Sequence, residues 1–274
     1  NLDGDETTAE PDDEKIDGMS VTDDLAQTET TYELNATYLF SGAEKGGFYD
    51  PSDLSTLWQD TAGTIAVTTD GDPVARIDDT SGNGYHLIQA DVNKQPTYNT
   101  DGTLHWLTFD GVDDCLTCAS VAFGTGEAFI GIGIEKTGDT DQSVIELSDD
   151  PTTTDGSLYM TIDPTNVYTF GSKGATAVSE VTGGTAGATK EYFLFDIDLV
   201  GNTGEVFVNG VSTATDTTET GTGTFSTPNT LNIGARGGLT RPFGGKVFGI
   251  ILRDSMTGVY EQHINDWLDI KTNG

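Results

Sequence analysis

Basic residues are scarce in this chain of 274 residues, because 12 lysines and arginines stand against 45 aspartates and glutamates. The formal net charge of −33 repels polyphosphates and anionic lipid surfaces. Long apolar runs are also absent, and none approaches the length that crosses a bilayer. The composition therefore predicts no nucleic-acid partner and no membrane insertion, and it is typical of proteins that function in concentrated salt.

Cysteine and histidine are rare as well. Cys115 and Cys118 are the only cysteines, and in a regular strand a spacing of three directs them to opposite faces. This spacing favours two free, buried thiols over a disulfide. The histidines His86, His105 and His263 are scattered and lack the spacing of a zinc site.

Short catalytic motifs are missing too. The sequence contains no Gly-x-Ser-x-Gly, no His-Glu-x-x-His and no Gly-x-x-x-x-Gly-Lys-Ser/Thr segment. These segments position a nucleophile, a zinc ion and a phosphate, respectively. We therefore expect a protein that is not an enzyme.

The sequence is rich in patterns of β-strands. From residue 193 to residue 199 every second residue is apolar, while Asp196 and Asp198 fall on the opposite face, which we expect to be solvated. Asn209-Gly210 lies between two alternating segments and predicts a type I′ hairpin turn. Further strands are expected near residues 64–68, 74–78, 97–98, 104–109, 115–119, 128–136, 143–148, 157–163, 166–171 and 175–181. The positions expected in the core include Phe193, Phe195, Ile197, Leu199, Val206, Val208, Ile233, Val247 and Ile251.

Two segments have helical character. Residues 53–58 begin with Asp53, a favourable N-cap, and are expected to form a short helix. Between residues 259 and 270 apolar side chains recur at i, i+4, i+7 and i+8 from Tyr260. This spacing predicts an amphipathic helix on the edge of the sheet assembly, with Trp267 in the core.

The acidic residues are concentrated at the N-terminus. Residues 1–35 hold twelve acidic residues and one basic residue, a net −11, which leaves −22 for residues 36–274. So polar a segment cannot form a core of its own and is expected to be an extended arm. Residues 31–40 are expected to be a first strand or a strip by which the arm docks. The apolar residues available to anchor the arm to a partner are Val21, Leu25, Tyr32, Leu34, Tyr38 and Leu39.

Several motifs occur in an order found in one family of domains. Phe109-Asp110-Gly111-Val112-Asp113-Asp114-Cys115-Leu116 follows Asp79-Thr80-Ser81-Gly82-Asn83-Gly84-Tyr85-His86, and residues 207–211, 231–234 and 243–253 come later. Together they resemble the laminin-G-like domains of the concanavalin A-like lectin superfamily. The resemblance implies an all-β fold, an antiparallel β-sandwich of the jelly-roll type, over residues 36–274.

A narrower likeness concerns residues 49–60, followed by residues 73–75 and 79–86. These segments are similar to laminin-G-like domains in the structural proteins of tailed viruses, which infect bacteria or archaea. The likeness implies a virion structural protein, a capsid decoration or a head- or tail-fibre component on the particle surface. Its partners would be major capsid or tail subunits and further copies of itself. The alternatives are a lectin module that binds host-surface glycans and, third, a glucan hydrolase-like fold.

The hydrolase alternative can be tested on the sequence. Glucan hydrolases of this superfamily carry Glu-x-Asp-x-Glu on a strand, which sets two carboxylates at the separation needed for retaining hydrolysis. Here only Asp196-Ile197-Asp198 comes near, without either glutamate. Glu146, with Asp149 and Asp150, is expected at a strand-to-loop boundary and has the wrong spacing. Catalysis is therefore not expected.

Two kinds of ligand contact remain open. Asp110, Asp113 and Asp114 crowd one turn, and oxygen-rich turns are what Ca²⁺ prefers, as in many family members that bind calcium at the rim of the sandwich. The same residues are ordinary turn formers. Sugar contacts could come from four aromatic residues that fit core positions equally well: Tyr85, Tyr98, Trp106 and Tyr168.

Overall fold

The computed structural model describes residues 34–148, 150–176, 178–185, 189–216, 222–237, 240–256 and 258–274. By its internal contacts the chain divides into two units, residues 1–32 and residues 33–274, and the second contains all the described residues. The expected anchors Val21, Leu25 and Tyr32 lie outside the described residues.

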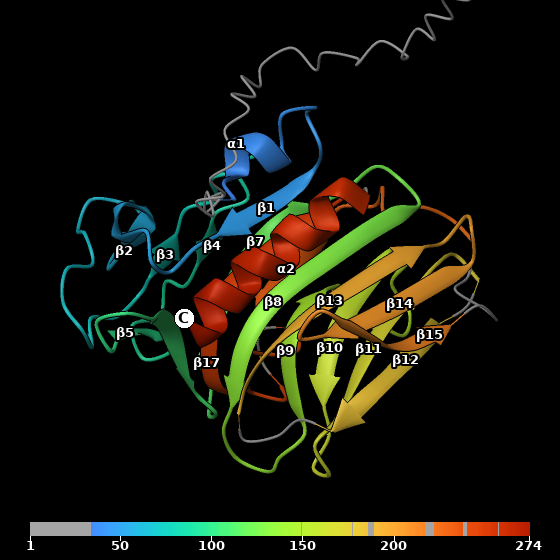
Figure 1. The fold of residues 1–274 in the computed structure, drawn as a ribbon. Coiled ribbons are helices and arrows are strands. Elements are labelled where there is room, and N and C mark those ends of the chain that lie inside the picture. The colour runs from blue at the N-terminus through green and yellow to red at the C-terminus, as the bar shows by residue number, and fades with distance from the viewer. Residues whose placement is uncertain are drawn as a thin grey trace, which may run out of the picture. The chain divides into compact units, whose positions relative to one another are not determined.

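Two antiparallel sheets pack face to face as a β-sandwich (Figure 1). One has eight strands in the order β15 (Val211–Asp216), β14 (Thr203–Val208), β13 (Lys190–Asp198), β8 (Glu127–Lys136), β17 (Gly244–Arg253), β6 (His105–Asp110) and β5 (Thr97–Thr100), and β1 (Gly46–Tyr49) also pairs with β17. The other has nine strands in the order β12 (Val178–Thr185), β11 (Val167–Lys173), β10 (Ser157–Ile162), β9 (Gln142–Leu147), β16 (Asn229–Ile233), β7 (Leu116–Val121), β4 (Leu87–Ile88), β3 (Arg76–Ile77) and β2 (Leu57–Trp58). The all-β sandwich expected from the alternating pattern is confirmed.

The core between the sheets is built from the alternating residues of each strand. Phe193, Phe195 and Ile197 of β13 point into it and are at most 1% exposed. Of the nine expected core positions, only Val208 is half-buried. The hairpin turn also follows the prediction, because Asn209 and Gly210 both have positive φ angles, 50° and 74°.

Helix α2 (Gly258–Asn273) covers the outer face of the eight-stranded sheet, where it contacts β13, β8 and β17 (Figure 1). The prediction that it packs on the sheet edge was wrong. Three glycines let it approach the strands. A Cβ added at Gly133 would lie 2.1 Å from Thr272 Oγ1, one at Gly249 would lie 2.5 Å from Trp267, and one at Gly131 would lie 3.2 Å from the side chain of Leu268.

This contact creates a second hydrophobic core on the outer face of the sheet. Trp267 is 5% exposed within it and lies 4.8 Å from the ring of Phe48, which confirms its expected place in a core. Its other buried members are Leu34, Ala36, Leu39, Phe40, Phe129, Tyr192, Leu194, Ile251, Ile264 and Leu268. Both faces of the eight-stranded sheet are thus buried where α2 lies.

The start of the sandwich differs from the prediction. Residues Ala36–Leu39 form the single helical turn α1 rather than a strand, because the side chain of Asn35 caps the turn by accepting the N–H of Tyr38 at 3.0 Å. Leu34 and Leu39 are buried in the chain's own second core, so their expected role as partner anchors is corrected. The domain therefore begins before residue 36, and Tyr38 is the exposed member of this group at 43%.

Short elements near the N-terminus account for the other differences. Residues 53–58 form the 3-10 helix η1 (Leu54–Thr56) followed by β2, and residues 64–68 contribute only one bridge, between Trp58 and Ala66. Strand β1 was missed because all four residues of Gly-Gly-Phe-Tyr are buried, which leaves no alternation to detect. Among the described residues, no helix is both long and apolar enough to cross a membrane.

The carboxylate of Asp196 is half-buried rather than solvated as expected, because it lies on the face that α2 covers. Its cross-strand neighbour on β14 is Glu205, and the neighbouring pair on β13 and β8 is Asp198 with Glu127. Burial, and then the charge of Glu127, raise the pKa of Asp196 to about 7, with smaller contributions from Glu205, Glu261 and Asp198. All four of these neighbouring charges are negative, so the carboxylates repel one another here.

The raised pKa of Asp196 predicts a pH-dependent stability. The unfolded chain ionises Asp at about pH 3.9, whereas the folded chain keeps this proton up to about pH 7, so stability falls as the pH rises through that interval. Asp196→Asn should remove this fall and raise the free energy of unfolding at pH 8 by roughly 1–3 kcal/mol. Urea denaturation at pH 5 and pH 8 measures the effect.

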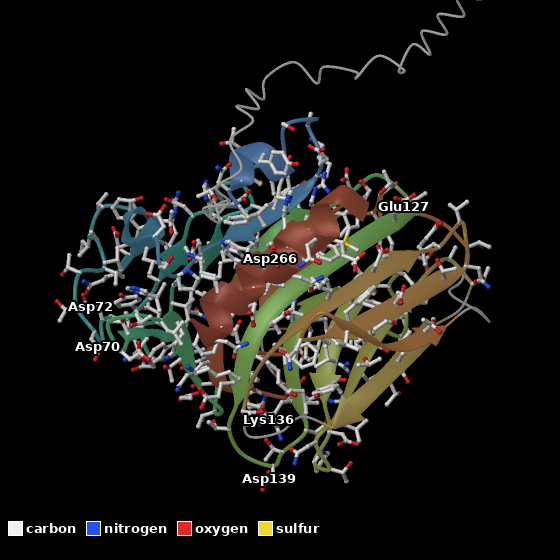
Figure 2. The ribbon with its side chains drawn as sticks, viewed as in Figure 1. Asp70, Asp72, Glu127, Lys136, Asp139 and Asp266 are labelled. Atoms are coloured by element: carbon white, nitrogen blue, oxygen red, sulfur yellow. The ribbon has the colours of Figure 1, made fainter. Side chains whose placement is uncertain are left out.

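The matched control is Asp139→Asn, which removes the same charge from an exposed loop after β8, away from Glu127 at the start of that strand (Figure 2). It should leave the pH dependence as it is. An equal effect of both substitutions would show that net charge, rather than the burial of Asp196, sets the pH dependence.

Candidate functional site

The three aspartates predicted as calcium ligands lie together in the turn between β6 and β7. Asp110 Oδ1 accepts the backbone N–H of Val112 at 2.8 Å and that of Asp113 at 3.2 Å. Asp114 Oδ2 accepts the N–H of Asp110 at 2.9 Å. One carboxylate oxygen from each of Asp110, Asp113 and Asp114 lies within 4.8 Å of the others. The turn therefore holds a group of oxygens with the composition that calcium prefers.

The electrostatics of this turn favour a cation. Asp114 is buried, whereas Asp110 is exposed and Asp113 is half-buried. Burial raises the pKa of Asp114 to about 6, helped by the charges of Asp110 and Asp113 and opposed by the hydrogen bond from the Asp110 backbone. A bound divalent ion would relieve this repulsion. The same hydrogen bonds also make a stable turn without an ion, so calcium binding stays a prediction.

A second group of polar side chains lies on the outer face of the nine-stranded sheet. Tyr159 on β10 is the cross-strand neighbour of Glu146 on β9, and its ring lies over Gly171 on β11, where a Cβ would come within 2.0 Å of it. Arg236 Nε lies 2.8 Å from Glu146 Oε2, and the Tyr159 hydroxyl donates to Glu180 Oε1 at 2.6 Å. Glu146 is fully buried in β9, which ends one residue later at Leu147, so it lies at the expected strand-to-loop boundary.

This group is poorly suited to catalysis. Glu146 is closed to solvent and paired with Arg236, although burial raises its pKa more than the arginine lowers it. The pKa of the Tyr159 phenol is raised, first by burial and then by Glu180, which opposes formation of a nucleophilic phenolate. Sequence reasoning missed Arg236 and Tyr159. The one available signal was the rarity of basic residues, since Arg236 is one of twelve.

The four aromatic candidates for sugar contacts separate clearly. Tyr98 and Tyr168 are each 2% exposed and belong to the core. Tyr85 is half-buried against that core, and its hydroxyl donates to the carbonyl of Ala122 at 3.2 Å. Trp106 lies on the outer face of the eight-stranded sheet, where it is half-buried. It is the one candidate of the four that lies on the outer face of a sheet.

Polar side chains of neighbouring strands surround Trp106. Its Nε1 donates to Thr108 Oγ1 at 3.0 Å, and the Thr108 hydroxyl donates to Asn99 Oδ1 at 2.6 Å. Lys246 Nζ lies 4.7 Å above the Trp106 ring and 2.8 Å from Glu135 Oε2. The strand register brings them side by side, because Thr108 is opposite Lys246 and Lys246 is opposite Glu135. We call these five half-buried residues the Trp106 face.

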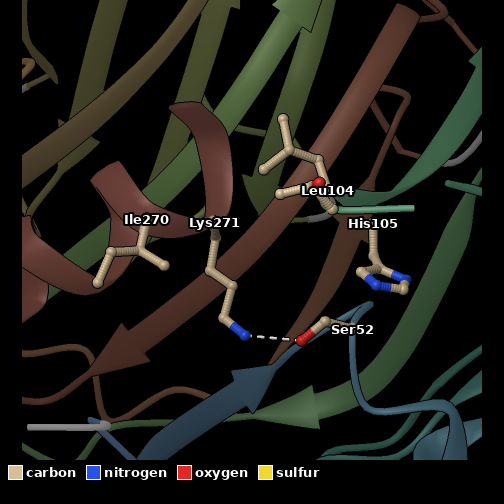
Figure 3. Close-up of a pocket in the computed structure, with 6 residues that line it drawn as sticks. Ser52, Leu104, His105, Ile270 and Lys271 are labelled. Carbon is tan, nitrogen blue, oxygen red and sulfur yellow. Dashed lines mark hydrogen bonds between the residues drawn. The ribbon is translucent and has the colours of Figure 1, made fainter. Parts of the chain in front are cut away.

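A hollow of about 310 Å³ lies next to the Trp106 face. It forms where β17 changes partner, since β6 pairs with β17 at 244–247 and β1 pairs with it at 250–253. Figure 3 shows the last turn of α2 beside this gap. The lining residues are Ser52, Thr103, Leu104, His105, Ile270 and Lys271.

The polar groups of the hollow are held in fixed positions. Lys271 Nζ lies 2.8 Å from Asp50 Oδ2 and donates to Ser52 Oγ at 2.6 Å (Figure 3). His105 Nδ1 lies 2.6 Å from the Tyr98 hydroxyl, and the two rings stack 5.9 Å apart. Among the described residues no hydrogen-bond partner is found for His105 Nε2. The polar groups that line the hollow are therefore one ammonium, two hydroxyls and one imidazole.

No protein-family model and no curated protein matches this sequence. Among solved structures, the chain is similar to domain 4 of an extracellular arabinanase from Geobacillus stearothermophilus in complex with arabinotriose, with a TM-score of 0.52 and 13% identity over 82% of this chain and 98% of that one. It is also similar to a sialidase from Trypanosoma rangeli, with a TM-score of 0.52 and 13% identity over 83% of this chain and 33% of that one. The binding domain of botulinum neurotoxin DC in complex with SialylT gives a TM-score of 0.50 and 12% identity over 82% and 53%, respectively.

These identities are low, so the likeness shows the fold alone. The chain is an antiparallel β-sandwich of the jelly-roll type, in agreement with the fold that its motifs imply.

Calcium binding at the turn of Asp110, Asp113 and Asp114 predicts a change in thermal stability. After treatment with EDTA, millimolar Ca²⁺ should raise the melting temperature, because a ligand of the folded state at 100 times its Kd adds about 2.7 kcal/mol. Asp114→Asn keeps a hydrogen-bond acceptor for the Asp110 backbone and should abolish the response. An unchanged melting temperature of the parent chain in saturating Ca²⁺ would remove the site.

Proposed function

We propose that this chain is a glycan-binding domain of the lectin type whose ligand lies on the Trp106 face. One observation carries the proposal. Trp106 is half-buried on a sheet face outside the core, and an amide, a hydroxyl, a carboxylate and an ammonium group surround it at fixed strand positions. This combination suits a sugar, which has apolar C–H faces and a rim of hydroxyl groups.

The charged pair of the face fits hydroxyl groups in particular. The carboxylate of Glu135 accepts hydrogen bonds and the ammonium of Lys246 donates them, and Glu135 Oε2 lies 2.8 Å from Lys246 Nζ. Two neighbouring hydroxyls of one sugar can therefore bond to one group each. Lys246 now covers the Trp106 ring, but its stem is flexible and can swing aside. Asn99 offers a further acceptor and two donors.

These contacts support weak binding by a single domain. Each hydrogen bond adds about 0.5–1.5 kcal/mol, so a handful of contacts corresponds to a Kd on the order of 0.1–1 mM. Many copies on one particle would convert this into strong attachment. A lectin of this kind therefore gains most from display in multiple copies.

The comparisons support a binding role by analogy of fold. Domain 4 of the arabinanase was found in complex with arabinotriose, and the neurotoxin binding domain was found in complex with SialylT. Analogy of fold is a weaker argument than the site itself. We carry over the binding of carbohydrate as a class and not either ligand.

We propose display on a virion surface as a second, compatible function. Residues 49–60 and 79–86 resemble laminin-G-like domains of tailed-virus structural proteins, and residues 1–35 carry a net −11. In this proposal the acidic N-terminal segment attaches the domain to capsid or tail subunits of an extracellular particle. The sandwich then serves as a decoration or fibre component that presents the Trp106 face to host glycans.

We further propose that the domain does not catalyse glycan hydrolysis. Retaining hydrolases need two carboxyl groups about 5–5.5 Å apart, one of them a nucleophile. In the described part of the chain, Glu146 is neutralised by Arg236, and Asp196 lies on the sheet face covered by α2 with a pKa raised to about 7. Neither supplies an accessible nucleophile.

Substitution of Trp106 tests glycan binding. A glycan array with the full chain should identify ligands. Titration calorimetry should then show at least tenfold weaker binding for Trp106→Ala, because the variant loses the apolar contact between the indole ring and the sugar. Trp58→Ala is the matched control, because Trp58 is a half-buried tryptophan on β2, outside the Trp106 face. Equal affinity of Trp106→Ala and the parent chain would place the ligand elsewhere.

Deletion of the N-terminal segment tests display. Removing residues 1–33 keeps Leu34 and the capped turn α1, so the sandwich should still fold and melt as the parent does. We expect it to be missing from purified particles by quantitative mass spectrometry. Normal incorporation of the truncated chain would contradict attachment through this segment.

A further inference from the structure

The hollow beside α2 holds a compensated charge. The ammonium of Lys271 lies 2.8 Å from the carboxylate of Asp50, and both side chains are mostly buried, at 23% and 17% exposure. Asp50 Oδ1 also accepts the N–H of Ser52 at 2.9 Å, which holds the carboxylate in place. A ligand in the hollow therefore meets a neutral pair rather than a free positive charge.

The surroundings of the hollow disfavour an anion further. The last turn of α2, which ends at Asn273, carries the partial negative charge of a helix C-terminus. Residues 36–274 carry a net −22 in addition. The pairing of Lys271 with Asp50, the C-terminus of α2 and the net charge of the domain thus each disfavour a carboxylated or sulfated ligand. The lining residues include no unpaired cation that would attract such a ligand.

The walls of the hollow are of two kinds. Leu104 and Ile270 are apolar, whereas Ser52, Thr103 and His105 present hydroxyl groups and a ring nitrogen. An apolar wall beside a polar wall matches the C–H face and the hydroxyl rim of a sugar ring. A volume of about 310 Å³ is near the lower limit for ligand pockets, which points to one small unit and not to a long chain inside the hollow.

The hollow and the Trp106 face are neighbours on β6. His105 lines the hollow, and the next residue is Trp106. Successive side chains of an extended segment point to opposite faces, so the lining residue that shares the side of Trp106 is Leu104, two residues earlier. Two residues span about 7 Å, so one saccharide chain can reach both places.

We propose that the hollow binds one uncharged sugar unit of a saccharide whose adjoining unit lies on Trp106, so that the domain selects neutral over acidic glycans. This assignment rests on the proposed glycan-binding function and gives it a substrate class. His105 Nε2 bonds a hydroxyl of the bound unit, and Leu104 and Ile270 contact its C–H face. Asp50 keeps the charge of Lys271 from attracting acidic sugars.

Two substitutions in the full chain test the assignment. His105→Phe keeps the ring beside Tyr98 and removes the Nε2 contact, so affinity for a neutral oligosaccharide should fall about fivefold. Asp50→Asn keeps an oxygen acceptor for Ser52 and leaves Lys271 with an uncompensated charge. It should raise affinity for acidic oligosaccharides, with uronic or sialic acid units, about tenfold.

The measurements are calorimetric titrations of parent and variants with neutral and acidic oligosaccharides of equal length, with melting curves to show that each variant is folded. The parent should bind the neutral members more tightly. Equal or tighter binding of the acidic members by the parent, or no change of affinity in either variant, overturns the assignment. If Trp106→Ala loses binding while both hollow variants keep the affinities of the parent, only the hollow is wrong. If no oligosaccharide binds the parent, the proposed function fails with it.

Discussion

The close approach of helix α2 to the glycines of β8 and β17 is the contact on which the rest of this domain depends. Gly133 and Gly249 have no side chain where Thr272 and Trp267 arrive, and a methyl group at either position would lie within 2.1 Å or 2.5 Å of them. A sheet face without these glycines would hold the helix at the usual distance, and the second core would lose its packing. Because the helix fits closely, an antiparallel sheet that could have one solvated face is buried on both faces over its centre.

The position of the helix also decides where a ligand can contact the eight-stranded sheet. Its body covers the middle strands β13, β8 and β17 and buries Leu194 and Ile251. The strands on either side of it are β14 and β15 at one end of the sheet and β6 and β5 at the other. Trp106 lies on β6, and the hollow lies under the last turn of the helix. Covering the face also destabilises one side chain, because the carboxylate of Asp196 is partly buried among like charges. On the outer face of the other sheet, Arg236 pairs with the buried carboxylate of Glu146.

Much of this arrangement could be predicted from the sequence, and the rest depends on contacts that sequence patterns do not encode. Alternation predicted the long strands and the inward residues of β13, and Asn209-Gly210 predicted the hairpin, because both signals are local. The residues of β1 and the burial of Asp196 could not be predicted, since a helix more than sixty residues further along the chain covers them. For the site, the sequence brought Asp110, Asp113 and Asp114 into one turn and offered Trp106 among four aromatic residues. It could not choose among those four, because exposure depends on where α2 ends, and it gave no sign that Lys271 and His105 meet across the gap between β1 and β6.

The most direct test of this account is the indole region of a ¹⁵N-labelled spectrum during titration with a neutral oligosaccharide. The chain has three tryptophans, and their environments differ: Trp58 Nε1 donates to Asp78 at 2.8 Å, Trp267 is 5% exposed under α2, and Trp106 lies on the outer face of the sheet at β6. We expect the Trp106 signal to shift in a saturable way while the Trp58 signal stays in place. A shift confined to Trp58, or no shift of any indole signal at saturating ligand, would contradict the claim that the Trp106 face binds glycans.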